Sequence, residues 1–541
     1  MNPQPPVTRM RMAARTSSVE RGAPAEYSPG GAGLGRYVEA WKAHLAETGW
    51  TPWLILGLAA FLRVFLLGIK PPHFDEGING WFVDQMMHNG FYRYDPTNYH
   101  GPLHFYALFL SESLFGRNVW ALRLPVVLVS IGCVWLTLKF EPFVGRNASR
   151  IAALAMAVSP GFVFYGRYAI HEVWLVLFTM LFIFGLLGLW KNGTTGYLWC
   201  AGMGLAGMIL TKETYIIHVV CAVIAIPVLM VSNLLTRLPD AKPTRQAWSY
   251  IDLAMVIGVG VALIVFFYSG TFLNWSGVKG LYLACKAWFQ TGEAGHGHEK
   301  PWYYWLELMA RYELPALAGL VLCVFCQAFK NLSLRYLAIY GVGLLLAYSY
   351  VHYKTPWCII NIIWPFLFTF GAAALLVIAR YRRAVYVILA LLVCYSLASS
   401  ISLNYFRCTT DTEPYVYVQT YNDMFKLTKP LLTLAKRNPV YYHLTGHLIR
   451  SSVYPLPWVL GDFDRVGYYE GGSMPANLDG DFLLVQEDKI KQVEAKLHGS
   501  YYTQPLRLRN YQEPSKLYLS AKIFKEFFPG KTPDFVGKGP G

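Results

Sequence analysis

WLILGLAAFLRVFLLGIKPPHFDE, residues 53–76, joins a long apolar run to two adjacent carboxylates. Pro71 and Pro72 end the helix that this run predicts, because proline lacks the backbone N–H and restricts the residue before it. Asp75 and Glu76 then stand where a membrane helix would meet water. They could mark a solvated helix start, since acids are favoured at the N-terminal end of a helix dipole. The charges of the later loops favour a functional pair instead.

The composition of the chain is that of a membrane protein. Of its 541 residues, 55% are hydrophobic and 15% are charged, whereas soluble chains carry about 25% charged residues. Apolar stretches near the ~17–20 residues needed to cross a bilayer recur up to position 402. We therefore expect an α-helical polytopic membrane protein with about 11 transmembrane helices. The apolar runs are 51–69, 119–138, 150–165, 172–190, 196–211, 214–235, 250–268, 314–329, 334–351, 358–379 and 384–402.

Basic residues alternate between the loops in a way that predicts the orientation. Every second loop is short and basic, so the positive-inside rule places those loops and the N-terminus in the cytoplasm. The odd number of spans then places residues 403–541 outside. The net charge of +15 is explained by these loops and does not indicate a nucleic-acid partner. The inside loops hold Lys139, Arg146, Arg150, Lys191, Arg237, Lys242, Arg245, Lys330, Arg335, Arg380, Arg382 and Arg383.

Three regions follow from this pattern. Residues 1–48 predict a disordered basic cytoplasmic tail, and 49–402 predict the membrane domain, with long outer loops at 70–118 and 269–313. Residues 403–541 predict a small extracytoplasmic α/β domain that binds an acceptor or caps the site. Its expected strands are 415–419, 440–443, 482–486 and 501–508, and its expected helices are 423–436 and 488–498.

The first outer loop carries two amphipathic patterns. Ile78, Trp81, Phe82 and Met86 recur at helical spacing after Glu76, which predicts a helix lying in the membrane interface. A second interfacial helix is expected at 103–115, just before the second membrane span. These helices would place the Asp75–Glu76 pair at the outer surface of the bilayer.

Ionisable residues gather at the outer helix ends. Each such group at membrane depth costs roughly 2.5–3.5 kcal/mol on insertion scales, so a cluster on one face indicates a function. The inner face has no comparable mixture of acids, histidines and bases, and we therefore expect an active site at the outer membrane boundary. The outer residues are Asp75, Glu76, Arg167, His171, Glu172, Lys212, Glu213, His296, His298, Glu313 and Lys354.

The order of these motifs resembles a known family. After the Asp75–Glu76 pair come Tyr-His-Gly-Pro-Leu at 99–103, Tyr-Gly-Arg-Tyr with His-Glu at 165–172, and Tyr-Lys-Thr-Pro-Trp at 353–357. The pattern resembles the membrane-embedded GT-C glycosyltransferases, in the protein O-mannosyltransferase and lipid A aminoarabinose transferase group (glycosyltransferase family 39-like). Within that group it is most similar to the bacterial and archaeal family labelled flippase activity-associated protein.

The resemblance implies a GT-C fold and a donor made of a sugar on a polyprenyl phosphate. The acceptor could be a protein, a lipid or a glycan, and the resemblance implies a multi-pass location in a bacterial inner (plasma) membrane. Two other functions remain open: a transport or flippase component, and an inactive GT-C partner in glycan assembly. A transporter is disfavoured because the charged residues lie at one face and not at the midplane.

Sugar transfer from a lipid phosphate needs a base for the acceptor and cations for the departing phosphate. Asp75 is the candidate base or metal ligand, with Glu76 or Glu172 as second carboxylate. Arg167 and Lys354 are candidate phosphate clamps, although an ion pair with Glu172 and a helix-end anchor are the respective alternatives. The further candidates for binding phosphate or sugar are Lys212, His100, Tyr353 and Trp357.

A divalent metal cation is the one cofactor that the sequence suggests. His296 and His298 alternate with glycines and follow Glu293, and such a set can chelate a cation. The glycines also suit a mobile loop without metal. The resemblance leaves metal dependence open.

Overall fold

The structure is a computed structural model that describes residues 49–98, 100–236, 246–294, 297–323, 330–380 and 382–537. The tail expected at residues 1–48 lies outside these ranges. Residues Thr51–Gly541 form one compact unit, to which the following description applies.

Each of the eleven apolar runs contains helix within the described residues. The helices are α2 (Thr51–Val64), α5 (Val119–Lys139), α7 (Arg146–Val158), α8 (Pro160–Tyr165), α9 (Glu172–Asn192), α10 (Thr195–Ile209), α11 (Tyr215–Thr236), α12 (Tyr250–Tyr268), α15 (Leu314–Cys323), α16 (Leu332–Tyr350), α17 (Ile359–Arg380) and α18 (Arg382–Ile401). Within the described ranges, seven helices are long and apolar enough to cross a membrane. They correspond to α5, α9, α11, α12, α16, α17 and α18.

The four remaining runs form shorter helices for visible reasons. The run at 150–165 is divided because Ser159 Oγ accepts a hydrogen bond from the N–H of Phe162 and Pro160 begins a new helix, α8. Proline suits that first position because its missing N–H needs no partner there. α2 and α10 have 14 and 15 residues, and the described part of α15 has 10.

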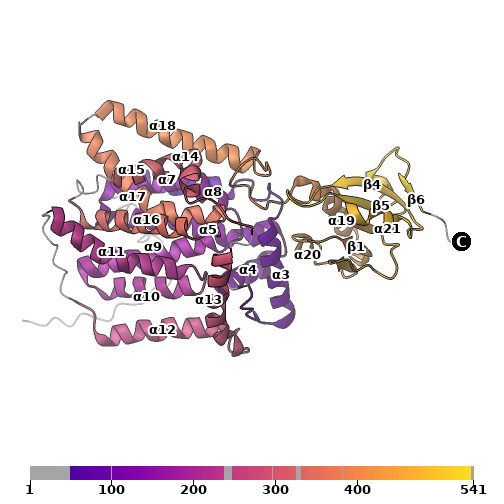
Figure 1. The fold of residues 1–541 in the computed structure, drawn as a ribbon, viewed down its shortest axis with the longest axis horizontal. Helices are drawn as coiled ribbons and strands as arrows, with labels where there is room; N and C mark the ends of the chain where they lie inside the picture. Colours follow the sequence, from indigo (N-terminus) through magenta and orange to yellow (C-terminus); the bar gives the residue numbers. More distant parts are fainter. Residues whose placement is uncertain are drawn as a thin grey trace, which may run out of the picture. The chain divides into compact units, whose positions relative to one another are not determined.

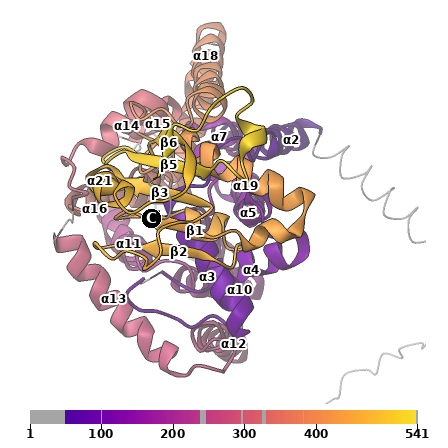
Figure 2. The same ribbon diagram turned by 90° about the vertical axis from the view of Figure 1, so that its right-hand side faces the viewer.

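α17 forms the centre of the helix bundle. It packs against α7, α15 and α16, and 89% of its apolar window is buried. Trp364 and Phe366 on this helix are fully buried. α12 and α18 lie at opposite edges of the bundle (Figure 2), and only 11% and 17% of their apolar windows are buried. Their apolar surfaces are therefore left for lipid.

Helices outside the apolar runs cover the end of the bundle beside the sheet domain (Figure 1). They are α3 (Phe74–Asn89), α4 (Leu103–Phe115), α13 (Ser276–Ala294) and α14 (Tyr304–Tyr312). α3 and α4 match the two helices expected in the first outer loop. His73 caps α3: its side chain accepts from the N–H of Asp75, and Glu76 accepts from the N–H of His73. The proline-rich turn before α3 therefore fixes where the acidic pair begins.

Residues after α18 form a domain with one six-stranded sheet. Its order is β2-β1-β3-β5-β4-β6, with β1 parallel to β2 and β3 and the other pairs antiparallel. The strands are β1 (Gly446–Ile449), β2 (Val466–Tyr469), β3 (Phe482–Gln486), β4 (Ser500–Leu506), β5 (Ser515–Ser520) and β6 (Phe535–Val536). The helices are α19 (Phe425–Arg437), α20 (Leu456–Val459) and α21 (Ile490–Glu494).

The expected α/β domain is confirmed, but some of its expected elements were wrong. The strand predictions for 482–486 and 501–508 match β3 and β4, and the helix expected at 423–436 matches α19. Residues 440–443 lie in a 3-10 helix, and 415–419 run without strand pairing. The helix expected at 488–498 is reduced to α21 and the short turn before it.

The sheet domain packs directly on α3. A Cβ added at Gly77 would lie 2.3 Å from the Cα of Pro455, and one at Gly80 would lie 2.4 Å from the Trp458 ring. Only glycine allows so close an approach of α20 to α3. The helix that begins with the acidic pair is thus held between the bundle and the sheet domain.

Candidate functional site

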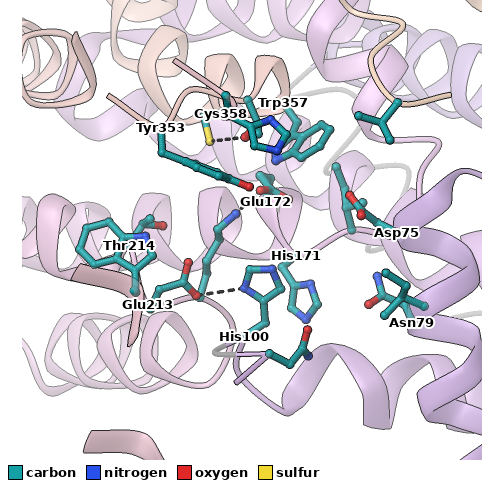
Figure 3. A pocket seen from close by; sticks show the side chains of 18 of the residues that line it. Asp75, Asn79, His100, His171, Glu172, Glu213, Thr214, Tyr353, Trp357 and Cys358 are labelled. Carbon is teal, nitrogen blue, oxygen red and sulfur yellow. Dashed lines mark hydrogen bonds and ion pairs between the residues drawn. The ribbon is translucent and has the colours of Figure 1, made fainter. Parts of the chain in front are cut away.

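One pocket lies where α9, α11 and α17 begin and α16 ends. Its cavity volume is about 330 Å³. Seven of the residues predicted from separate parts of the sequence line it: Asp75, His100, Glu172, Lys212, His298, Tyr353 and Trp357. Figure 3 shows Asp75 facing the cavity opposite Tyr353, with Glu172 and His171 between them. The structure thus brings together most of the residues that the sequence predicted for a site at this end of the bundle.

Asp75 presents a carboxylate to this pocket from the first turn of α3. Its side chain is 34% exposed, and its Oδ2 lies 3.7 Å from Nδ1 of His73. The positive end of the helix dipole favours a negative charge at this position. In the described part of the chain, no lysine or arginine lies within ion-pair distance of Asp75. The carboxylate is therefore open to a ligand.

Glu76 points away from the pocket and is fully buried. Arg123 donates from Nη2 and Nε to its two oxygens at 2.7 and 2.8 Å, and the N–H groups of His73 and Ala169 donate at 2.8 Å each. Burial alone would raise the pKa of Glu76, but the charge and hydrogen bonds of Arg123 lower it to about 2. The expectation that Glu76 serves as a second catalytic carboxylate is corrected here, because its hydrogen-bonding capacity is already used.

Arg167 also lies outside the pocket. Its guanidinium donates from Nη1 to the carbonyls of Leu62 and Phe65 at 2.9 and 2.7 Å, and from Nη2 to that of Leu66 at 2.7 Å. The last carbonyls of a helix lack N–H partners within the helix, and at the end of α2 the guanidinium of Arg167 donates to them. The side chain of Arg167 therefore does not line the pocket, which corrects its assignment as a phosphate clamp. It also does not form the ion pair with Glu172 that was the alternative, because Glu172 pairs with Lys212.

Glu172 pairs instead with Lys212 inside the pocket. Lys212 Nζ contacts Glu172 Oε1, and both side chains are buried. Burial alone would lower the pKa of Lys212, but the charge of Glu172 raises it well above its usual value. Beside this pair, His100 Nδ1 lies 3.0 Å from Glu213 Oε2. This side of the pocket therefore holds two acid–base pairs.

Lys354 lies beside the pocket but does not line it. Its Nζ donates to the carbonyls of Val351 and Lys300, at 2.5 and 3.2 Å. Its backbone N–H donates to the carbonyl of His298 at 3.1 Å. Burial lowers the pKa of Lys354. The side chain thus fastens two outer loops together, which corrects its assignment as a phosphate clamp, while its neighbours Tyr353 and Trp357 do reach the pocket.

The expected metal ligands are only partly described. His296 and the side chain of Glu293 lie outside the described structure. His298 Nδ1 lies 2.7 Å from the hydroxyl of Tyr417. Among the residues that the structure describes, no group of three or more His, Cys, Asp or Glu could hold a metal ion. The metal site stays a prediction.

Sequence reasoning missed several side chains of the pocket. They include Asn79, Trp288 and, from the sheet domain's leading segment, Val418, whereas His171 and Glu213 were expected in the outer cluster but were given no role. Asn79 could have been found, because it follows Asp75 by four residues and so shares its helix face. Val418 could not, because residues 415–420 reach the pocket only through the tertiary fold. That segment is held by His73 Nε2, 2.8 Å from the carbonyl of Tyr417.

Known proteins resemble this chain in part of its sequence and in most of its fold. Residues 99–267 match the family described as dolichyl-phosphate-mannose-protein mannosyltransferase. The chain is 31% identical over 140 residues to the protein called "Putative mannosyltransferase YkcB" of Bacillus subtilis and 30% identical over 119 residues to "Putative mannosyltransferase YycA" of the same organism. These matches cover 24% and 20% of this chain, and 19% and 17% of the relatives, so the chain spans about a fifth of the curated proteins it matches.

The crystal structure of ArnT from Cupriavidus metallidurans bound to undecaprenyl phosphate shares the fold. It superposes with a TM-score of 0.58 over 87% of this chain and 98% of that one, at 14% identity. Identity this low carries the architecture and not the chemistry. The chain therefore shares the fold of this GT-C protein, and its residues 99–267 resemble the dolichyl-phosphate-mannose-protein mannosyltransferase family.

Proposed function

We propose that this protein is a membrane glycosyltransferase that transfers a sugar from a polyprenyl-phosphate donor to an acceptor at the outer face of the membrane. The observation that carries the proposal is the open carboxylate of Asp75 in a polar pocket at one end of an apolar bundle. The family description supports a mannosyl donor. The ArnT structure contains undecaprenyl phosphate, which supports a polyprenyl carrier.

The proposed reaction is an inverting displacement. The acceptor oxygen forms a bond to the anomeric carbon, and the bond from that carbon to the phosphate oxygen breaks. Asp75 takes the acceptor proton, as a carboxylate in hydrogen-bond reach can. The polyprenyl phosphate leaves with the electron pair, on the side of the pocket where Lys212 offers positive charge and hydrogen bonds.

An apolar groove beside the pocket suits the lipid chain of such a donor. It has a volume of about 470 Å³ and is lined by α11 and α16, with Cys323 of α15. Val220 and Ala347 of the groove are close in sequence to Ile217 and Tyr348 of the pocket. A prenyl chain in this groove would keep its phosphate at the pocket while the chain stays among membrane-spanning helices.

Asp75→Asn tests the proposal. Membranes carrying the full chain are supplied with radiolabelled mannosyl-phosphoryl undecaprenol, and label transferred to membrane acceptors is counted. Removing a general base costs roughly 10²–10⁴-fold in rate, so transfer should fall at least a hundredfold. Asp95→Asn is the matched control, because Asp95 lies in the same loop and, among the described residues, its carboxylate accepts hydrogen bonds from Thr97 alone.

Equal transfer by the Asp75→Asn and unaltered proteins would refute Asp75 as the base. No label transfer by the unaltered protein, with lipid translocation intact, would favour the transport alternative. No transfer and no translocation would favour an inactive assembly partner.

A further inference from the structure

Two buried polar groups of the pocket have no role in the reaction proposed above. His171, in the turn before α9, is 2% exposed, lines the pocket, and its Nε2 has no hydrogen-bond partner in the described structure. Asn79, on α3, is 5% exposed and also lines the pocket. Buried polar atoms are nearly always paired, so an unpaired one facing a cavity indicates a ligand.

The surroundings of His171 make it a hydrogen-bond acceptor. Its ring lies 4.2 Å from that of His104 and 4.6 Å from that of His100, measured between centroids. Burial and the nearby His104 and His100 lower the pKa of His171 well below its usual value, so the imidazole is neutral. The backbone of Gly101 acts on this pKa in the opposite direction, as a carbonyl that accepts from the ring N–H does. The other ring nitrogen, Nε2, therefore keeps its lone pair.

The amide of Asn79 is oriented by the same part of the chain. Its Nδ2 donates to the carbonyl of Ala169 at 2.8 Å, two residues before His171. A planar amide held by its nitrogen turns its oxygen the other way, and within the described residues Asn79 Oδ1 has no partner. Asp75, Asn79 and His171 all line the same pocket (Figure 3). Together they form an acceptor wall, which offers the carboxylate, Oδ1 and Nε2 as hydrogen-bond acceptors.

We propose that His171 Nε2 and Asn79 Oδ1 determine specificity by accepting hydrogen bonds from two hydroxyl groups of the transferred sugar. A wall of acceptors repels phosphate but matches the hydroxyls of a sugar, each of which can donate. The phosphate then lies towards Lys212. This inference rests on the proposed function and names the part of the donor that the acceptor wall recognises.

Monodeoxy donors test the inference. The full chain in lipid nanodiscs is titrated with mannosyl-phosphoryl undecaprenol and its 2-, 3-, 4- and 6-deoxy analogues. One analogue should bind the unaltered protein about tenfold more weakly than the parent, equivalent to about 1.4 kcal/mol. His171→Phe keeps an aromatic ring beside His104 but has no acceptor. It should bind the parent about tenfold more weakly and show no further loss with that analogue.

Asn79→Leu should also bind the parent about tenfold more weakly and show no further loss with one analogue, which lacks a different hydroxyl. This variant tests the inference independently if His171→Phe does not fold. His443→Phe is the control, because His443 is exposed in the sheet domain and should leave all five affinities unchanged. If the parent binds and both variants keep the full deoxy penalties, the inference is overturned and the proposed function stands. If the unaltered protein binds no mannosyl lipid, both fail.

Discussion

Glu112 joins α4 to the sheet domain through a buried acidic cluster. It is 5% exposed, and Asp84 on α3 is 7% exposed. Arg117 donates to Asp84 at 2.6 Å, contacts Asp462 of the sheet domain at 3.4 Å, and donates to the carbonyl of Trp458 at 3.0 Å. One arginine thus faces several carboxylates. Burial and the charge of Asp84 raise the pKa of Glu112 from 4.5 to about 8.

This raised pKa sets the sign of a pH effect on stability. Between pH 4.5 and about 8 the unfolded chain loses the proton of Glu112 and the folded chain keeps it. The free energy of unfolding therefore falls as pH rises, by about 1.4 kcal/mol per pH unit for one proton. From pH 5 to pH 7 the loss is about 3 kcal/mol. Glu112→Gln has no proton to lose, and this part of the pH dependence should disappear.

The assay compares the apparent Tm of the two proteins in the same detergent and at the same scan rate. The Glu112→Gln protein should gain a few degrees over the unaltered protein between pH 5 and pH 7, because about 1 kcal/mol shifts Tm by roughly 2–4 °C or less in a chain of this size. Glu526→Gln is the control, since Glu526 is an exposed partner of Arg437. A Tm difference that does not change with pH would refute the assignment of a neutral buried Glu112.

Two further substitutions test how α3 is held. Arg123→Leu leaves Glu76 buried without its cation and should destabilise the protein by about 3–5 kcal/mol, measured as a fall in Tm, with partial recovery in the double variant that adds Glu76→Gln. A double variant with no recovery of Tm would contradict the ion-pair interpretation. Gly80→Ala places a Cβ against the Trp458 ring and should cost about 1–3 kcal/mol, seen as faster protease cleavage of the sheet domain. Gly57→Ala is the control, because a Cβ there meets nothing within 4 Å, and the protease should cleave its sheet domain at the original rate.

The sequence predicted the location of the site better than the role of each residue in it. Outer helix ends could be found from apolar length and basic loops, and those ends do converge on one pocket. Asp75 and Glu76 could not be distinguished, because neighbours on a helix point about 100° apart and the direction of each depends on packing. The partner that occupies Glu76 is Arg123, which is 47 residues further along.

Arg167 shows the same limit in another form. Its carbonyl partners lie more than 100 residues earlier, at the end of α2, and no local pattern predicts them. In the sheet domain, the apolar run 482–486 correctly predicted β3. The alternation at 415–419 did not predict a strand correctly, because Tyr415 packs on Tyr312 and Val418 takes a φ of 53°. Aromatic packing on the bundle replaces strand pairing there.

The glycine contacts of α3 have a practical consequence for ligands that act from the aqueous side. Pro455 and Trp458 press on α3 at Gly77 and Gly80, about half a turn and one and a half turns after Asp75. An antibody fragment or peptide wedged into this seam would tilt the helix and move the carboxylate without entering the bilayer. A ligand bound in this seam would thus displace the carboxylate of Asp75 without occupying the apolar helix bundle.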